Sequence, residues 1–261
     1  MPINFHDEHN RHTYAMRSAD DSWKSLILDT IDVSNKQIAD IGCGGGIYTK
    51  ALLEMGAGHV IGVDFSEEML KGAAANCQHM GNVAFHQGDA YHTALLSKSL
   101  DIVLERALIH HLDNLDACFV EASRILKEGG ALIIQDRTPE NCLLPGDEHH
   151  IRGYFFERFP QLKPKEIARR YESEQVQQAL ESSGFQVVKV ETLWETRYIY
   201  DSFEQLANDL MQRTGRSILH ELNDAELLDM IDFLKEKLSH KQFPIIEKDV
   251  WTLWFAVKKS S

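Results

Sequence analysis

The segment Ile38–Gly46 carries the residues whose types and spacing most clearly suggest chemistry. It reads I-A-D-I-G-C-G-G-G, with Asp40 two positions before the first glycine. Glycines between a strand and a helix let the backbone approach a ligand closely. Gly42 and Gly44 fit a dinucleotide-binding loop, but Ile47 occupies the sixth position, where that loop needs glycine. A carboxylate so close to the loop favours an ammonium or sulfonium group over a pyrophosphate.

Two further acids follow at the ends of predicted strands. Asp64 lies 22 residues after Gly42, where a carboxylate can accept hydrogen bonds from both ribose hydroxyls. Asp89, followed by Ala90, ends the third strand, where an acid can accept from the exocyclic amine of adenine. Three acids at three successive strand ends predict a cationic ligand that carries a nucleoside. A helix cap at Asp64 and a turn at Asp89 are the alternative interpretations.

The elements that would position these acids alternate along the first half of the chain. Short aliphatic runs of this kind suit strands covered on both faces, as in a parallel sheet. Strands and helices that alternate over roughly 100 residues predict a doubly wound α/β sheet. The predicted strands are 35–42, 59–65, 83–89, 100–106 and 130–136, and the predicted helices are 48–55, 66–79 and 114–126.

The second half changes character. Residues 139–170 contain four prolines and predict loops and short helices. A helix over 173–183 and strands over 185–194 and 249–257 follow, and two helical segments, 202–214 and 224–238, separate the strands. Long insertions of this kind usually form lids or substrate pockets. Trp251 and Trp254 cannot share a face of a regular strand, so at least one should pack against helices.

Five motifs in order resemble the class I S-adenosylmethionine-dependent methyltransferases: D-I-G-C-G-G-G, V-D-F-S-E-E-M-L, G-D-A, H-H-L and R-I-L-K-E-G-G-A-L. The resemblance covers about residues 36–136 and continues through the late strand pair. It implies a Rossmann-like, mostly parallel seven-stranded sheet whose last strand is antiparallel. It also implies S-adenosyl-L-methionine as cofactor and S-adenosyl-L-homocysteine as product.

The resemblance further implies cofactor contacts. The implied residues are Asp40, Gly42 and Gly44 at the methionine end, Asp64 at the ribose, Phe65 and Met69 beside the adenine, Asp89 and Ala90 at its edge, Glu105 and Arg106 near the sulfonium, and Tyr14 and Arg17 in a segment folded over the cofactor. Many relatives have a small or polar residue in place of Glu105 and Arg106. Whether Arg106 faces the ligand carboxylate or pairs with Glu105 is open at this point.

His110 follows the fourth strand, on the rim where an acceptor is expected in an open α/β sheet. Methyl transfer from a sulfonium depends mainly on proximity and orientation, and a base is needed only if the acceptor must lose a proton. His110 is therefore the candidate base or substrate-binding residue, with a capping or loop histidine as the alternative. Relatives with the same His-His-Leu turn include quinone-biosynthesis enzymes.

Other polar residues give weaker evidence of a functional role. The run Asp147–His150 predicts a solvated loop and no metal site, because adjacent ligands on a loop are poorly specified. Arg216 could meet an anionic acceptor, although an arginine on the surface is the favoured interpretation. The four cysteines form no C-x-x-C pair, which argues against a disulfide scaffold or a zinc ribbon.

Composition excludes several classes. The chain has 261 residues, 27 basic and 40 acidic, for a net charge of −13, which disfavours nucleic-acid binding. No apolar run approaches a membrane span, and the polar opening segment resembles neither a signal nor a transit peptide. We expect a cytoplasmic protein with a small-molecule partner, no metal, no membrane and no nucleic acid. The sequence does not predict the oligomeric state.

The resulting hypothesis is methyl transfer from S-adenosylmethionine to a small molecule at oxygen, nitrogen or carbon. The alternatives are a protein or nucleic-acid methyltransferase, a noncatalytic S-adenosylmethionine-binding protein, and a nicotinamide-dependent oxidoreductase. The predicted division is an N-terminal helical segment over the cofactor site at 1–35, an α/β core at 36–139, cap insertions at 140–172 and 201–245, and the rest of the sheet at 173–200 and 246–261.

Overall fold

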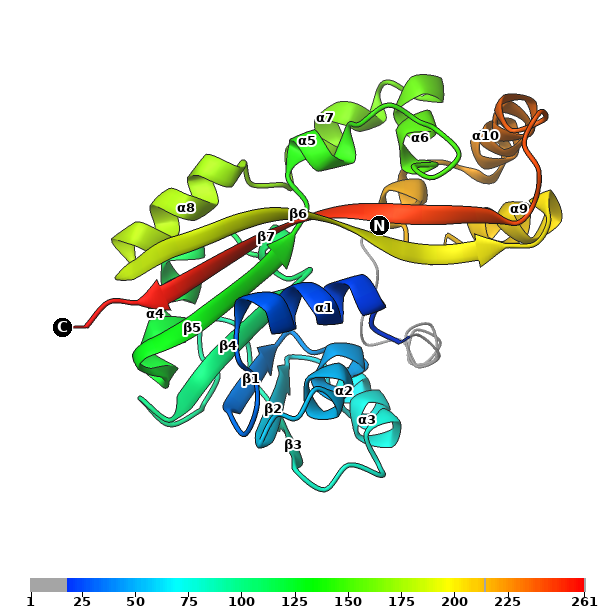
Figure 1. Cartoon of the computed structure of the whole chain (residues 1–261). Coiled ribbons are helices and arrows are strands. Elements are labelled where there is room, and N and C mark those ends of the chain that lie inside the picture. Colours follow the sequence, from blue (N-terminus) through cyan, green and yellow to red (C-terminus); the bar gives the residue numbers. More distant parts are fainter. Residues whose placement is uncertain (1–17, 214, 261) are drawn as a thin grey trace. The chain divides into compact units, whose positions relative to one another are not determined.

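The computed structural model describes residues 18–213 and 215–260 (Figure 1). Contacts between residues divide the chain into two compact units. In the described part, the first, which we call the α/β unit, comprises residues 18–136, 171–193 and 252–260. The second, which we call the insertion unit, comprises residues 137–170, 194–213 and 215–251.

A seven-stranded sheet with strand order β3-β2-β1-β4-β5-β7-β6 organises the fold. Neighbouring strands among β1–β5 run parallel, and β7 runs antiparallel to β5. The predicted doubly wound sheet with a late antiparallel strand is therefore confirmed. The strands are β1 (Gln37–Ile41), β2 (His59–Asp64), β3 (Val83–Gln87), β4 (Leu100–Arg106), β5 (Leu126–Asp136), β6 (Phe185–Tyr200) and β7 (Ile245–Lys258).

The helices of the α/β unit begin where the sequence offers caps. The Ser66 hydroxyl accepts a hydrogen bond from the backbone N–H of Met69, which confirms the predicted helix start. The Asn114 side chain does the same for Ala117. The helices are α1 (Asp21–Thr30), α2 (Ile47–Glu54), α3 (Glu67–Asn76), α4 (Leu115–Ile125) and α8 (Ser173–Ser182), with a 3₁₀ turn η2 at Ile109–His111.

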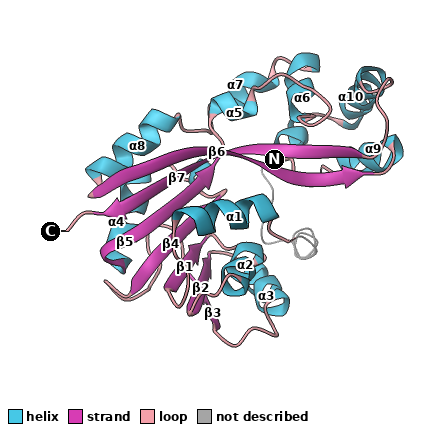
Figure 2. Ribbon diagram, viewed as in Figure 1, coloured by secondary structure: helices cyan, strands magenta, loops and turns pink. Residues whose placement is uncertain are grey.

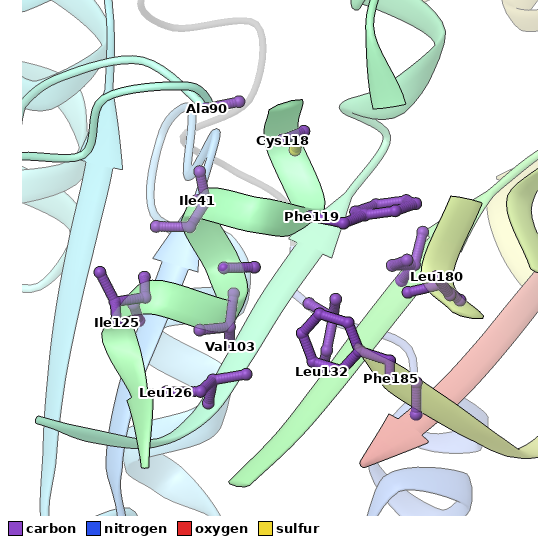
Figure 3. Packing of buried hydrophobic residues seen from close by; sticks show 14 of the residues in the cluster. Ile41, Ala90, Val103, Cys118, Phe119, Ile125, Leu126, Leu132, Leu180 and Phe185 are labelled. Atoms are coloured by element: carbon purple, nitrogen blue, oxygen red, sulfur yellow. The ribbon is translucent and has the colours of Figure 1, made fainter. Parts of the chain in front are cut away.

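The core of the α/β unit joins the sheet to α4 and α8. Phe119 from α4 and Leu180 from α8 lie near Leu132 and Phe185 in this cluster (Figure 3). Trp254 is fully buried in the same cluster, and its indole N–H donates to the Ser173 hydroxyl at 3.0 Å. This confirms that at least one of the two late tryptophans packs against a helix.

The insertion unit has an apolar core of its own, built around side chains such as Phe155, Leu206, Leu219 and Met230. The prediction of short helices within 139–170 and of two later helical segments is confirmed. The elements are α5 (Pro139–Cys142), α6 (Arg152–Arg158), α7 (Leu162–Ile167), α9 (Phe203–Met211), η3 (Ser217–Glu221) and α10 (Asp224–Lys237). No helix in the described ranges is long and apolar enough to cross a membrane.

Three strands are longer than predicted. Figure 2 shows β6 and β7 as long strands, and β6 continues six residues past Trp194, the predicted end. The segment Glu195–Tyr200, which follows, mixes charged with aromatic residues. The structure buries Glu195 and the side chain of Arg197 inside the insertion unit, so charge did not mark the end of the strand. Strands β5 and β7 likewise begin four residues earlier than predicted, at Leu126 and Ile245.

Candidate functional site

The glycine loop between β1 and α2 has the backbone that its sequence predicts. Gly42, Gly44 and Gly46 have positive φ values of 72°, 51° and 76°, which favour glycine. A Cβ on Gly46 would come within 2.9 Å of the Ala73 Cβ on α3, so this glycine permits close packing. A Cβ on Gly44 would meet nothing within 4 Å, so there is open space beside the loop backbone.

Asp64, the last residue of β2, fixes this loop. Its Oδ2 accepts a hydrogen bond from the Gly44 N–H at 2.9 Å, and its Oδ1 accepts from the Ser66 N–H at 2.9 Å. Each carboxylate oxygen has two lone pairs and can accept more than one hydrogen bond. The carboxylate is buried and joins the loop after β1 to the start of α3.

Asp40 lies in β1 and is also buried. The hydroxyl of Thr49 in α2 donates to its Oδ2 at 2.6 Å. Burial raises the pKa of Asp40 to about 6, and the hydrogen bond from Thr49 opposes this shift. The negative charge of Asp64 raises the pKa further, whereas the guanidinium of Arg106 lowers it. A cationic ligand beside Asp40 would favour its ionised form.

Glu105 and Arg106 end β4 and point to opposite faces of the sheet. Glu105 is 1% exposed, and the Cys118 thiol donates to its Oε1 at 3.4 Å. Its Oε2 is buried without a hydrogen-bond partner among the described residues, and burial raises the pKa of Glu105 to about 7. The Arg106 guanidinium lies over the Tyr48 ring, 3.9 Å from the centroid. The two residues therefore do not pair with each other.

His110 and Asp136 form a close polar pair in the α/β unit. The carboxylate of Asp136, the last residue of β5, lies 2.8 and 2.9 Å from His110 Nδ1. The backbone N–H of His110 also donates to Asp136 Oδ2, at 3.2 Å. Asp136 is fully buried and His110 is mostly buried. An ionised Asp136 holds the proton on Nδ1, which makes Nε2 the acceptor nitrogen.

Asp136 was missed by the sequence analysis. The rule that singled out Asp64, an acid at the carboxyl end of a predicted parallel strand, applies equally to Asp136 at the end of 130–136. Its partner His110 is 26 residues away in sequence, so spacing gave no indication of the contact. Strands β4 and β5 are neighbours in the sheet, and this brings the turn after β4 to the end of β5.

The residues predicted to surround the adenine lie after β2 and β3, which are neighbouring strands. Phe65 is 49% exposed, whereas Met69 and Ala90 are buried. Asp89 Oδ1 accepts from the backbone N–H groups of Tyr91 and His92, both at 2.8 Å, so Asp89 holds the turn after β3. Its contact with an adenine stays a prediction.

Other predictions concern residues that lie outside the described ranges or in the insertion unit. Tyr14 and Arg17 lie outside the described residues. Asp147 Oδ1 accepts from the backbone N–H groups of His149 and His150, as in a tight turn. The described chain has no group of three or more His, Cys, Asp or Glu residues that could hold a metal ion.

The favoured interpretation of Arg216 as a surface residue is wrong. Its side chain is 2% exposed and donates to Glu247 at 2.6 Å and to the Tyr200 hydroxyl at 3.0 Å. It also forms an ion pair with Asp209. A single arginine in a polar stretch gives no sequence pattern that distinguishes an exposed from a buried position.

The α/β unit combines two features at the ends of neighbouring strands. Buried acids lie there, and open space lies beside the backbone of the glycine loop. In the strand order β3-β2-β1-β4, successive strands are added on one side of β1 and then on the other, so the order reverses between β1 and β4. Open α/β sheets bind ligands at such a point. Asp40 and Asp64 suit a ligand with a positive charge and a ribose. Glu105 Oε2 has no hydrogen-bond partner in the part of the chain that the structure describes.

Comparison with known proteins agrees with this chemistry. Residues 39–134 match the model of a methyltransferase domain family. The chain is 31% identical to the uncharacterised methyltransferase YcgJ of Bacillus subtilis over 130 residues, 48% of this chain and 51% of that one. It is 32% identical to the ubiquinone biosynthesis O-methyltransferase of Maricaulis maris over 99 residues, 37% of this chain and 39% of that one. The matched region thus spans about half or less of these relatives.

The fold likeness extends further than the sequence likeness. The crystal structure of the YcgJ protein from Bacillus subtilis superposes with a TM-score of 0.58 at 21% identity. The superposition covers 91% of this chain and 98% of that one. At this level of identity the likeness shows a shared fold.

Proposed function

Residues 39–134 match a methyltransferase domain family, and from this premise we propose that the chain is a class I S-adenosylmethionine-dependent methyltransferase that methylates a hydroxyl group of a small molecule. S-adenosylmethionine supplies a methyl group already activated as part of a sulfonium. The chain's own residues must bind the cofactor, orient the acceptor and manage the acceptor's proton.

Cofactor binding is assigned to the acids of the α/β unit. Asp64 would accept from the two ribose hydroxyls while it holds the glycine loop through Gly44. Asp40 would lie at the cationic methionine end, where a positive charge opposes its raised pKa. Glu105 would offer its second oxygen to a donor of the same ligand. All three carboxyl groups favour a positively charged ligand.

The His110–Asp136 pair is the observation that carries the choice of a hydroxyl acceptor. A neutral amine can attack with its own lone pair, whereas a hydroxyl becomes a good nucleophile as it loses its proton. His110 Nε2 would take that proton while the new oxygen–carbon bond forms and the sulfur–carbon bond breaks. Asp136 would stabilise the imidazolium that results. Release of the proton to water would later restore the original His110–Asp136 pair.

The relative from Maricaulis maris supports this choice, because its name is that of an O-methyltransferase. The support is limited to the matched region. We further propose a cytoplasmic location, which suits the four cysteines that the structure leaves as free thiols.

The experiment that tests the proposal is turnover of the full chain with methyl-labelled S-adenosylmethionine and matched acceptors. Phenols, catechols and hydroxyquinones would be compared with the corresponding anilines, and products identified by mass spectrometry. We expect methyl ethers together with S-adenosylhomocysteine. Methylated anilines without ethers would overturn the hydroxyl assignment, and S-adenosylhomocysteine binding without turnover across the panel would favour a noncatalytic binding protein.

A pair of adjacent histidine variants sharpens this test. His110→Gln should lower kcat by about 10²- to 10⁴-fold, the usual contribution of a general base, with little change in S-adenosylhomocysteine affinity. The matched control is His111→Gln, an exposed neighbour whose ring centroid lies 4.0 Å from that of His110. Equal losses in both variants would show that His110 acts through local structure only.

A further inference from the structure

The two edge strands of the sheet differ in length and character. Among the described strands, β3 and β6 each have a neighbour on one side only. Strand β3 has five residues and ends in exposed His86 and Gln87. Strand β6 has 16 residues and contains neither proline nor glycine. Short length and proline are two common protections of a sheet edge against pairing with another chain, and β6 has neither.

The part of β6 that belongs to the α/β unit, residues 185–193, exposes apolar side chains. Val188 and Val190 are 56% and 40% exposed, and they lie on one face of the strand because side chains alternate. Thr192, on the same face, is exposed as well. Cross-strand contacts between β-branched side chains stabilise a sheet. This edge is therefore suited to the addition of a further strand.

Two opposite charges flank Val190 on the other face of the strand. Lys189 Nζ lies 3.2 Å from Glu191 Oε1 in the same strand, and both side chains are partly exposed. Nζ also donates to the Thr30 hydroxyl at 3.4 Å. An ammonium group has three N–H donors, so these two contacts do not exhaust it. The edge thus carries one positive and one negative charge, placed symmetrically about an apolar residue.

This pattern is complementary to itself. In an antiparallel pair of two β6 strands with the two-fold axis at Val190, Lys189 lies opposite the partner's Glu191, and Glu191 lies opposite the partner's Lys189. On the other face, Val190 lies opposite the partner's Val190, and Val188 opposite the partner's Thr192. We propose that β6 binds β6 of a second copy of this chain in this register, which joins the two seven-stranded sheets into one.

The neighbouring registers are less favourable. An axis at Lys189 would place two ammonium groups opposite each other, and an axis at Glu191 would place two carboxylates so. Like charges directly opposite destabilise a strand pair. An axis between two residues would set Val190 against Lys189 or Glu191, because a shift by one residue exchanges the faces. The charges therefore favour the axis at Val190 over its neighbours.

The inference goes beyond the proposed function, because no residue of 185–193 is assigned to the cofactor or the acceptor. Sedimentation velocity of the full chain between about 1 μM and 100 μM is the first measurement. One strand from each copy makes a small contact, so we expect a reversible dimer whose fraction rises with concentration. A monomer throughout this range would overturn the proposal. S-adenosylhomocysteine affinity, measured in parallel, reports on the methyltransferase site separately.

A substitution on the axis then locates the interface. Val190→Lys places two ammonium groups opposite each other, so the dissociation constant of the dimer should rise about tenfold or more. The matched control is Val120→Lys in α4, which changes a valine that is 57% exposed and should leave dimerisation unchanged. Circular dichroism checks that both variants are folded. An unchanged dimer in folded Val190→Lys would overturn the proposal.

Charge reversal tests the register. Lys189→Glu and Glu191→Lys each place like charges opposite each other in a homodimer, so each variant alone should dimerise about tenfold more weakly or worse. An equal mixture of the two variants restores both opposite-charge pairs between the chains. Each chain in the mixture still carries two like charges, so repair of the pair within one strand cannot explain a recovery.

Native mass spectrometry of the mixture, with one variant labelled with ¹⁵N, distinguishes the heterodimer from the two homodimers. We expect the heterodimer to predominate. A mixture that stays as monomeric as the separate variants would overturn the pairing, and so would homodimers of the single variants as stable as the wild-type dimer.

Discussion

The two units of this protein differ in the charged residues that they bury. The α/β unit buries Asp40, Asp64, Glu105 and Asp136 at or near the carboxyl ends of its strands. The insertion unit buries arginines that come from loops, helices and one strand, together with acids: Arg137, Arg152, Arg170, Arg197 and Arg216, and Glu166, Glu195 and Glu247. Net charge over the whole chain, −13, conceals this division.

The largest expected effect tests whether an acid of the α/β unit takes part in methyl transfer or only in cofactor binding. Asp136→Asn should lower kcat by about 10³- to 10⁴-fold, because an amide that donates to His110 Nδ1 leaves the proton on Nε2. Cofactor affinity should stay within about twofold. Steady-state kinetics with calorimetry of S-adenosylhomocysteine binding would measure both, with the exposed Asp113→Asn as control. Lost affinity with unchanged kcat would place Asp136 in cofactor binding instead.

The next effect compares two buried arginines of the insertion unit. Arg216→Met should lower the free energy of unfolding by about 3–5 kcal/mol, because it leaves Asp209 and Glu247 with too little positive charge. Arg152→Met should change it by about 1 kcal/mol or less, because Glu166 keeps Arg169 and Arg170. Urea unfolding of both variants measures the difference. Equal destabilisation would contradict the expectation that Glu166 keeps enough partners when Arg152 is replaced.

A pH-dependent effect then probes the buried acids. Burial raises the pKa of Glu105 from 4.5 to about 7 in the folded protein, so its contribution to stability is full below about pH 4.5 and is lost as the pH rises through 7. Glu105→Gln should therefore add about 2–3 kcal/mol to the free energy of unfolding at pH 8.5 and little at pH 5.

Thermal unfolding of the Glu105→Gln variant and the wild type across that range would measure this gain. Glu67→Gln, at an exposed position in the first turn of α3, is the matched control and should show no such dependence. A constant difference between Glu105→Gln and wild type at all pH values would contradict ionisation of the buried carboxyl.

The smallest effect concerns cofactor affinity. Asp64→Ala should weaken S-adenosylhomocysteine binding about tenfold or more, because two charge-assisted hydrogen bonds to the ribose are lost. Calorimetry measures the affinity, and melting of the protein without ligand checks that the loop bond to Gly44 is not essential for folding. Unchanged affinity would remove Asp64 from the site.

The comparison also explains what sequence could predict. The acids of the α/β unit follow from topology, because parallel strands bring their carboxyl ends to one edge. A short apolar run that ends in Asp64 therefore predicts both a strand and a site. The same regularity covers Asp136, which was overlooked because the analysis had attached ligand roles only to the first four strand ends.

The insertion unit offers no such regularity. Arg137, Arg152 and Arg170 lie on separate segments, and their approach depends on how short helices pack. Arginine is mostly exposed in proteins, so a surface position was the reasonable prediction for Arg216. Only tertiary structure shows that Arg216 is buried and ion-paired, and that three guanidiniums share the single carboxylate of Glu166.

The order of strands has a consequence for biosynthesis. Strand β7 is the last to be made among the described strands, yet it lies between β5 and β6 in the sheet. Until residues 245–258 leave the ribosome, β5 and β6 each expose an edge with unpaired backbone groups, which invites pairing with other chains. Both units contribute part of β6 and β7, so neither can be completed before translation reaches this strand. The edges of β5 and β6 therefore stay unpaired until β7 is available to fill the gap between them.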